Sequence, residues 1–277
     1  MSLFTAVEMA PRDPILGLNE QFAADTNPAK VNLGVGVYYD ENGKLPLLQC
    51  VQEAEKRMMA SPTARGYLPI DGIAAYDSAV KSLVFGADSE PVKSGRVATV
   101  QAVGGTGGLK IGADFLRKLS PGAKVMISDP SWENHLALFR NAGFDVDYYP
   151  YYDAQNRSID FAGMKAALAA AAPGTIVVLH ACCHNPTGYD ITAAQWDAVV
   201  AICKAGKLTP FLDMAYQGFG FGLQEDGAAV QKFVAAGLNF LVSTSFSKSF
   251  SLYGERVGAL SVLCESKEEA ARVLSQL

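Results

Sequence analysis

The sequence predicts an α/β fold in which a mostly parallel sheet carries helices on both faces. Near-continuous apolar runs of strand length recur at 96–103, 124–128, 175–181, 208–214, 239–245 and 257–264. Helical patterns separate these runs at 109–119, 133–141, 161–171, 193–204 and 228–236. Strands that are apolar throughout and alternate with amphipathic helices are typical of a parallel sheet that is buried on both sides.

Two helix starts carry a capping pattern, in which a hydroxyl residue is followed three positions later by Gln or Glu. These are Thr192 with Gln195 and Ser266 with Glu269. Residues 1–45 show a different pattern, in which extended segments are interrupted by Pro and Gly. We therefore expect an N-terminal arm and part of a small domain over 1–45, and one large domain over 46–277.

The composition excludes several classes of protein. The chain has 277 residues, 49% hydrophobic content and a formal charge of −5, which is unlike the basic field of a nucleic-acid-binding protein. Its apolar runs are too short to span a bilayer, and the N-terminus lacks the charged and apolar regions of a secretory leader. We expect a cytoplasmic protein with no membrane or nucleic-acid partner.

The five cysteines support the same location. Their number is odd and their spacing is not that of a disulfide framework, so reduced thiols are the simpler interpretation. The adjacent pair Cys182 and Cys183 could form a redox or metal site. Its place at the end of an apolar strand favours a role as buried filler, and we expect no metal site.

Ligands of α/β sheets collect at the carboxyl ends of strands, and the first such end here carries a glycine cluster. Residues 104–108 read Gly-Gly-Thr-Gly-Gly and are predicted to open a helix at Leu109. Backbone N–H groups at a helix start, with the Thr106 hydroxyl, form a cradle suited to phosphate. The cluster lacks the spacing of a dinucleotide fingerprint, and alone it indicates no more than a tight turn.

The next three strand ends carry an aromatic ring, an amide and a carboxylate. Trp132 could stack on a flat ring, and Asn185, held extended by the proline after it, could donate to an oxygen. Asp213 ends an apolar strand, with Tyr216 three residues further on. A buried carboxylate is costly without a partner, and a protonated pyridine nitrogen would be such a partner.

The last strand end carries Lys248 in the run Ser-Phe-Ser-Lys at 245–248, with Arg256 eight residues later. This lysine is predicted to form a Schiff base with an aldehyde cofactor, while the hydroxyls of Ser245 and Ser247 and the Arg256 guanidinium hold its phosphate. Each fragment alone has a simpler structural role, such as a solvated lysine or a turn asparagine. Together they are the inventory of a pyridoxal 5'-phosphate site.

The motifs at 185–188, 213–216 and 245–248 resemble those of class I (fold type I) aminotransferases that depend on pyridoxal phosphate, in the aspartate and aromatic-amino-acid group. The resemblance extends over the whole chain, including 13–16, 31–36 and 66–70. Segments 37–39, 96–99 and 182–184 look most like bacterial tyrosine (aromatic-amino-acid) aminotransferases. The resemblance implies fold type I and assigns cofactor binding to the large domain.

The resemblance also implies a role for each matching residue. Lys248 would carry the cofactor and shuttle a proton, Asp213 would keep the ring nitrogen protonated with support from His135, and Tyr216 would bond the ring oxygen together with Asn185. The phosphate would be bound by Gly105, Thr106, Ser245 and Arg256, and Trp132 would stack on the ring. Gly36, Trp132 and Asn185 would surround the substrate carboxylate. Tyr67 would reach the phosphate of a partner subunit, which implies a homodimer with shared active sites.

The implied reaction moves the amino group of an L-amino acid, aromatic or aspartate, to a 2-oxo acid such as 2-oxoglutarate. Other fold type I enzymes, a β-lyase or a decarboxylase, would use the same lysine and aspartate. Family members continue beyond this C-terminus and supply carboxylate-binding arginines there, so a truncated, catalytically impaired fragment is a further alternative. A nicotinamide dehydrogenase built on residues 104–108 is the weakest alternative.

Overall fold

The structure is a computed structural model that describes residues 2–11, 16–32, 34 and 36–277. The chain divides into two compact units between Leu47 and Leu48. The first unit contains one described helix, α1 (Leu16–Ala24). The expected division fell after residue 45, and the assignment of the first unit to an arm and part of a small domain stays a prediction.

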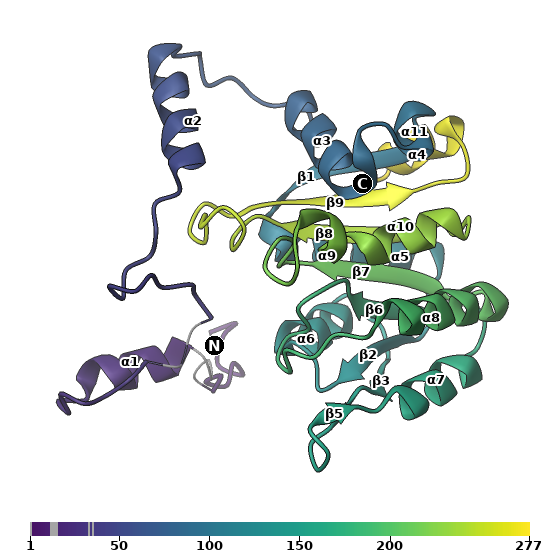
Figure 1. Ribbon diagram of the computed structural model, residues 1–277, viewed down its shortest axis with the longest axis horizontal. Helices are drawn as coiled ribbons and strands as arrows, with labels where there is room; N and C mark the ends of the chain where they lie inside the picture. Colours follow the sequence, from purple (N-terminus) through teal and green to yellow (C-terminus); the bar gives the residue numbers. More distant parts are fainter. Residues whose placement is uncertain (1, 12–15, 33, 35) are drawn as a thin grey trace. The chain divides into compact units, whose positions relative to one another are not determined.

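The second unit is built on a seven-stranded sheet with the order β1-β9-β8-β7-β6-β2-β3 (Figure 1). Strands β8, β7, β6, β2 and β3 pair in parallel, whereas β9 lies antiparallel between β1 and β8. The mostly parallel sheet is therefore confirmed. The strands are β1 (Val97–Val103), β2 (Val125–Asp129), β3 (Val146–Pro150), β6 (Ile176–His180), β7 (Thr209–Met214), β8 (Phe240–Ser245) and β9 (Val257–Leu263).

All six predicted strands are present, and β3 was missed. This edge strand exposes Asp147 and Tyr148, so it lacks the continuous apolar run by which the other strands are recognised. The two-residue strands β4 (Tyr152–Asp153) and β5 (Ser158–Ile159) were also missed, because they are shorter than any periodic signal.

Helices cover both faces of the sheet, each over its own hydrophobic core. One core includes side chains of α3 (Ala74–Lys81), α7 (Phe161–Ala170), α8 (Ala193–Gly206) and α10 (Ala228–Ala235). The other includes side chains of α5 (Gly104–Leu119), α6 (Glu133–Asn141) and α11 (Lys267–Leu274). The remaining helices are α2 (Gln49–Ala60), η1 (Ser82–Gly86), α4 (Glu90–Lys93) and α9 (Leu223–Asp226).

Helix α5 begins at Gly104, so the predicted start at Leu109 was wrong by more than one turn. The glycines are part of the helix because, without side chains, they let α5 pack closely against the sheet. A Cβ atom at Gly108 would lie 2.7 Å from the Ala259 carbonyl oxygen, and one at Gly112 would lie 2.5 Å from the Phe211 ring. The glycine cluster that the sequence analysis interpreted as a turn is therefore the first part of helix α5.

Both predicted helix caps form, one of them completely. Thr192 accepts a hydrogen bond from the Gln195 amide, and the Gln195 side chain accepts one from Thr192 N. Ser266 accepts from the Glu269 amide at 3.1 Å, but the Glu269 carboxylate accepts from Glu265 N instead. The apolar face of α11 packs against the same core as α5 and α6. Across the described residues, every helix is too short or too polar to cross a membrane.

We predict that Gly112→Ala destabilises the second unit by about 1–3 kcal/mol, the usual cost of overpacking. The added methyl group would meet the ring of Phe211, which is fully buried. Urea unfolding would measure the loss. The matched control is Gly122→Ala, where a Cβ atom has nothing within 4 Å. Equal stability of the two variants would contradict this packing account.

Candidate active site

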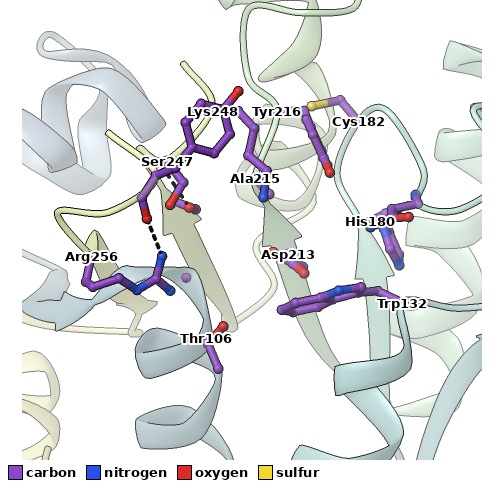
Figure 2. A pocket seen from close by; sticks show the side chains of 14 residues that line it. Thr106, Trp132, His180, Cys182, Asp213, Ala215, Tyr216, Ser247, Lys248 and Arg256 are labelled. Carbon is purple, nitrogen blue, oxygen red and sulfur yellow. Dashed lines mark hydrogen bonds between the residues drawn. The ribbon is translucent and has the colours of Figure 1, made fainter. Parts of the chain in front are cut away.

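A pocket opens at the edge of the sheet where the parallel strands end (Figure 2). Strands β2, β6, β7 and β8 deliver their carboxyl ends there, and the antiparallel β9 begins there. Residues far apart in the sequence therefore converge on one cavity. Its lining consists of Gly105, Thr106, Trp132, His180, Cys182, Asn185, Asp213, Ala215, Tyr216, Ser245, Ser247, Lys248, Tyr253 and Arg256.

Asp213 lies at the floor of the pocket, close to the end of β7, and is 7% exposed. Its Oδ2 lies 2.8 Å from Nε2 of His135, which is fully buried on α6. The other ring nitrogen of His135 lies 2.9 Å from the Ser131 hydroxyl. All three groups are satisfied when the imidazole donates to the carboxylate and the hydroxyl donates to Nδ1. Asp213 is thus held in one orientation, with a carboxylate edge facing the pocket.

Lys248 follows β8, and its amine points towards Asp213 (Figure 2). Burial lowers the pKa of this amine below its usual value, the Asp213 carboxylate opposes that shift and the Arg256 guanidinium reinforces it. The nitrogen also lies 5.2 Å from the centre of the Tyr216 ring. A lysine with a lowered pKa is available as a nucleophile or a proton acceptor nearer neutral pH.

The opposite side of the pocket is suited to an anion. Arg256 and Thr106 lie together there, away from Trp132 and His180 (Figure 2). The glycines that open α5 make room for this group: a Cβ atom at Gly104 would lie 2.8 Å from the Arg256 guanidinium, and one at Gly105 would lie 2.9 Å from Cβ of Ser245. A guanidinium, two hydroxyls and the start of a 16-residue helix favour a phosphate or a carboxylate.

The lining also includes an aromatic ring, an amide and a phenol. Trp132 precedes α6 and contacts His135 edge-on, at 5.4 Å between ring centres. Burial, followed by the Asp213 charge, raises the pKa of Tyr216, so its hydroxyl stays protonated and can donate. Asn185 is fixed through its backbone, which donates to Nδ1 of His180 at 3.3 Å.

Three predicted site residues are not part of this lining, and the first of them, His135, lies behind Asp213 as described above. Gly36 is exposed and belongs to the first unit. Tyr67 is fully exposed, and its side chain is not among the residues that form the pocket. Of the segments that carried the resemblance, residues 13–15, 33 and 35 lie outside the described part of the chain.

The sequence analysis gave no role to several residues that line the pocket, of which His180 is the most informative. Burial lowers its pKa well below the usual value, and the nearby His135 and His184 act in the same direction. Because Nδ1 accepts from Asn185 N, the proton of the neutral ring lies on Nε2, a buried atom that has no hydrogen-bond partner in the described part of the chain. Its position as the last residue of β6 was the available signal. Ala215 and Tyr253 were also missed, and Cys182 was expected only as buried filler.

Comparison with known proteins identifies the class to which this fold and site belong. Residues 28–277 match the family model described as aminotransferase class I and II. The chain is 63% identical to an aspartate aminotransferase of Pseudomonas aeruginosa, over all of this chain and 70% of that protein. It is 52% identical to an aromatic-amino-acid aminotransferase of Escherichia coli, over 99% of this chain and 70% of that protein. The chain belongs to the class I and II aminotransferase family.

Solved structures agree with this assignment. An aromatic-amino-acid aminotransferase from Burkholderia pseudomallei, covalently bound to pyridoxal phosphate, superposes with a TM-score of 0.98 at 67% identity. The match covers all of this chain and 69% of that one. An aromatic amino acid aminotransferase from Psychrobacter, crystallised with aspartic acid, gives a TM-score of 0.97 at 46% identity. The predicted family and fold type are therefore confirmed.

We predict that the two charges flanking Lys248 move its pKa in opposite directions. Asp213→Asn removes the anion that favours the ammonium form, so the pKa of Lys248 falls further. Arg256→Gln removes a cation, so the pKa rises. The pH dependence of acetylation at Lys248, followed by mass spectrometry without added ligand, measures both shifts, with the exposed Lys118 as internal control. Shifts of the reverse sign would contradict the electrostatic description of the pocket.

Proposed function

We propose that this chain is an aminotransferase that uses pyridoxal 5'-phosphate to move an amino group from an L-amino acid to a 2-oxo acid. The observation that carries the proposal is the convergence of three groups in one pocket: the Lys248 amine, the Asp213 carboxylate held by His135, and the Arg256 anion site. Membership of the aminotransferase family supports it. So does the Burkholderia pseudomallei structure, which carries pyridoxal phosphate covalently.

The residues present fit that cofactor. The glycines at the start of α5 leave space beside Arg256 and Ser245 that a side chain would fill, and with Thr106 they would hold the phosphate. Asp213 would pair with the ring nitrogen, and Trp132 would stack on the ring. Asn185 and Tyr216 would donate to the ring oxygen. The buried His180 Nε2 proton, which has no partner among the described residues, is a further donor at the wall of the pocket.

The chemistry is divided between cofactor and protein. When bound, pyridoxal phosphate supplies an electrophilic carbon and a ring that withdraws electrons from the substrate Cα. The protein supplies the attachment point and the proton transfer, both at Nζ of Lys248. A neutral amine is required for both tasks, and the lowered pKa of Lys248 favours that form.

His135 acts through Asp213. The hydrogen bond between them fixes the orientation of the carboxylate at the floor of the pocket. There the negative charge of Asp213 would stabilise the protonated ring nitrogen of the cofactor. His135 is therefore a positioning residue, whereas Asp213 would touch the cofactor. The cost of burying the Asp213 charge is offset by this partner and would be offset further by the ring nitrogen of the cofactor.

The proposed amino donors are L-aspartate and the aromatic L-amino acids, with 2-oxoglutarate as an acceptor. The relatives named above include both an aspartate and an aromatic-amino-acid aminotransferase, at 63% and 52% identity. Trp132 and Asn185 remain the proposed contacts for the substrate carboxylate, together with Gly36 from the first unit. A β-lyase or decarboxylase reaction finds no separate support in the pocket.

We further propose that the enzyme is a homodimer in which Tyr67 of each chain contacts the phosphate in its partner. Tyr67 and the nearby Ile70 are fully exposed, so both side chains are available for contact with a second chain. The proposed location is the cytoplasm. All five cysteines are free thiols, which suits a reducing compartment.

The first test of the function is the absorbance of the chain after addition of pyridoxal phosphate. We expect a visible band from bound cofactor that is absent in Lys248→Ala and that changes when aspartate or tyrosine is added, with release of the matching 2-oxo acid. Lys118→Ala, a change at an exposed lysine of α5, should keep the band. A protein-bound band of equal strength in Lys248→Ala would contradict the proposal.

A second test separates the acid from its positioning residue. Asp213→Asn should lower the transamination rate by about 100-fold or more, the size of loss seen when a preorganised charge is removed. His135→Gln should lower it less and leave the affinity for pyridoxal phosphate nearly unchanged, because the carboxylate remains. A loss in His135→Gln larger than that in Asp213→Asn would contradict this division of roles.

A further inference from the structure

The loop that follows β6 places two sulfur atoms next to a buried carboxylate. Cys182 and Cys183 directly precede His184, and Asp226 is the last residue of α9. One oxygen of Asp226 and the two Sγ atoms all lie within 4.8 Å of one another. Among the described residues this is the one group of three or more His, Cys, Asp or Glu side chains close enough to hold a metal ion.

The carboxylate is fixed before any ion binds. Asp226 is 4% exposed, and its Oδ2 accepts hydrogen bonds from the amides of Gly218 at 2.8 Å and Gly220 at 2.9 Å. Its Oδ1 accepts one from Phe221 N at 2.9 Å. Each carboxylate oxygen can accept two such bonds, so Oδ1 keeps capacity for one more electrophile.

The two sulfurs are fixed by the backbone. Cys183 has a left-handed conformation with φ of 49°, which breaks the alternation of side chains expected in an extended chain and leaves both sulfurs on the side of Asp226. Asp190 holds this turn, because its carboxylate accepts from the amides of Cys183 at 2.7 Å and His184 at 2.8 Å. Both of these hydrogen bonds are donated by backbone amides, so neither involves a cysteine side chain.

The spacing suits a bridging ion better than a disulfide bond. A tetrahedral ion with metal–sulfur bonds of about 2.3 Å separates its two sulfurs by about 3.8 Å, which is compatible with the group described here. A disulfide between adjacent residues would join Cα atoms only about 3.8 Å apart, below the usual range of about 4.4–6.8 Å. Two thiolates and one carboxylate form a donor set that selects soft or borderline ions such as Zn²⁺ over Mg²⁺ or Ca²⁺.

We propose that Cys182, Cys183 and Asp226 form a binding site for one thiophilic divalent cation of the zinc type, with water in the fourth position. Cys183 is half-buried and gives the ion access, whereas the other two ligands are buried. The ion joins the loop after β6 to α9. It lies beside the active-site pocket, since Cys182 is part of the pocket lining and Sγ of Cys183 lies 3.9 Å from the Tyr216 carbonyl oxygen.

Cd²⁺ is the probe, because its bonds to thiolate absorb in the ultraviolet and its NMR shift reports the number of sulfur ligands. Titrated into the full chain loaded with pyridoxal phosphate, one ion per chain should bind with two sulfur ligands. Cys182→Ser and Cys183→Ser should each weaken binding by more than about 100-fold, since even outer-shell changes at metal sites cost about 10–100-fold. Asp226→Asn should weaken binding and leave the sulfur count at two.

The matched control is Cys50→Ser, which removes an exposed thiol outside the group and should leave the tight site intact. Bound ion should also raise the midpoint of thermal unfolding, and Cys183→Ser should abolish this rise. Cys183→Ser changes one half-buried atom, so we expect this variant to fold, and circular dichroism can check that it does. The test therefore stays interpretable even if Asp226→Asn misfolds. Absence of tight binding in the unmodified chain, tight binding that survives in Cys183→Ser, or equal weakening in Cys50→Ser would overturn the proposal.

Discussion

The pocket is organised around the cost of burying the Asp213 carboxylate at the end of β7. A carboxylate in such a place needs a fixed partner, and His135 reaches it from α6 with its own second nitrogen held by Ser131. The same negative charge opposes the shift that burial imposes on Lys248. Burial thus lowers the pKa of the amine and the Asp213 charge raises it, so the pKa depends on both. A change at Asp213 would alter the pKa of Lys248, the pKa of Tyr216 and the proposed partner of the ring nitrogen together.

A second constraint is the close approach of α5 to the sheet. Its glycines let the helix begin against Ser245 and Arg256, so the anion site and the lysine site share one wall. Packing and function are therefore coupled in this helix. The contact at Gly112 with Phe211 belongs to the core, and the space at Gly105 belongs to the pocket. Gly105 and Gly112 are about two turns apart on α5, so one helix serves both the pocket and the core.

The sequence was sufficient for most of the sheet and for most of the pocket, for a physical reason. Buried parallel strands are apolar throughout, and their carboxyl ends meet at one edge, so polar residues at those ends are predicted neighbours. The start of α5 was mispredicted because glycine disfavours helices in general, and only tertiary contact explains it. The position of His180 at the end of β6 was visible in the sequence, but the lack of a partner for its Nε2 among the described residues was not, because it depends on the folded surroundings. Gly36 and Tyr67 remain predictions about other parts of the assembly.

The central claim is that Lys248 is the residue to which the cofactor bonds. Borohydride reduction of the chain loaded with pyridoxal phosphate, followed by peptide mass spectrometry, locates that bond directly. We expect the added mass on Lys248, in the peptide that contains the Ser-Phe-Ser-Lys run, at a stoichiometry near one per chain. A reduced adduct distributed over exposed lysines such as Lys118, with Lys248 unmodified, would contradict the account.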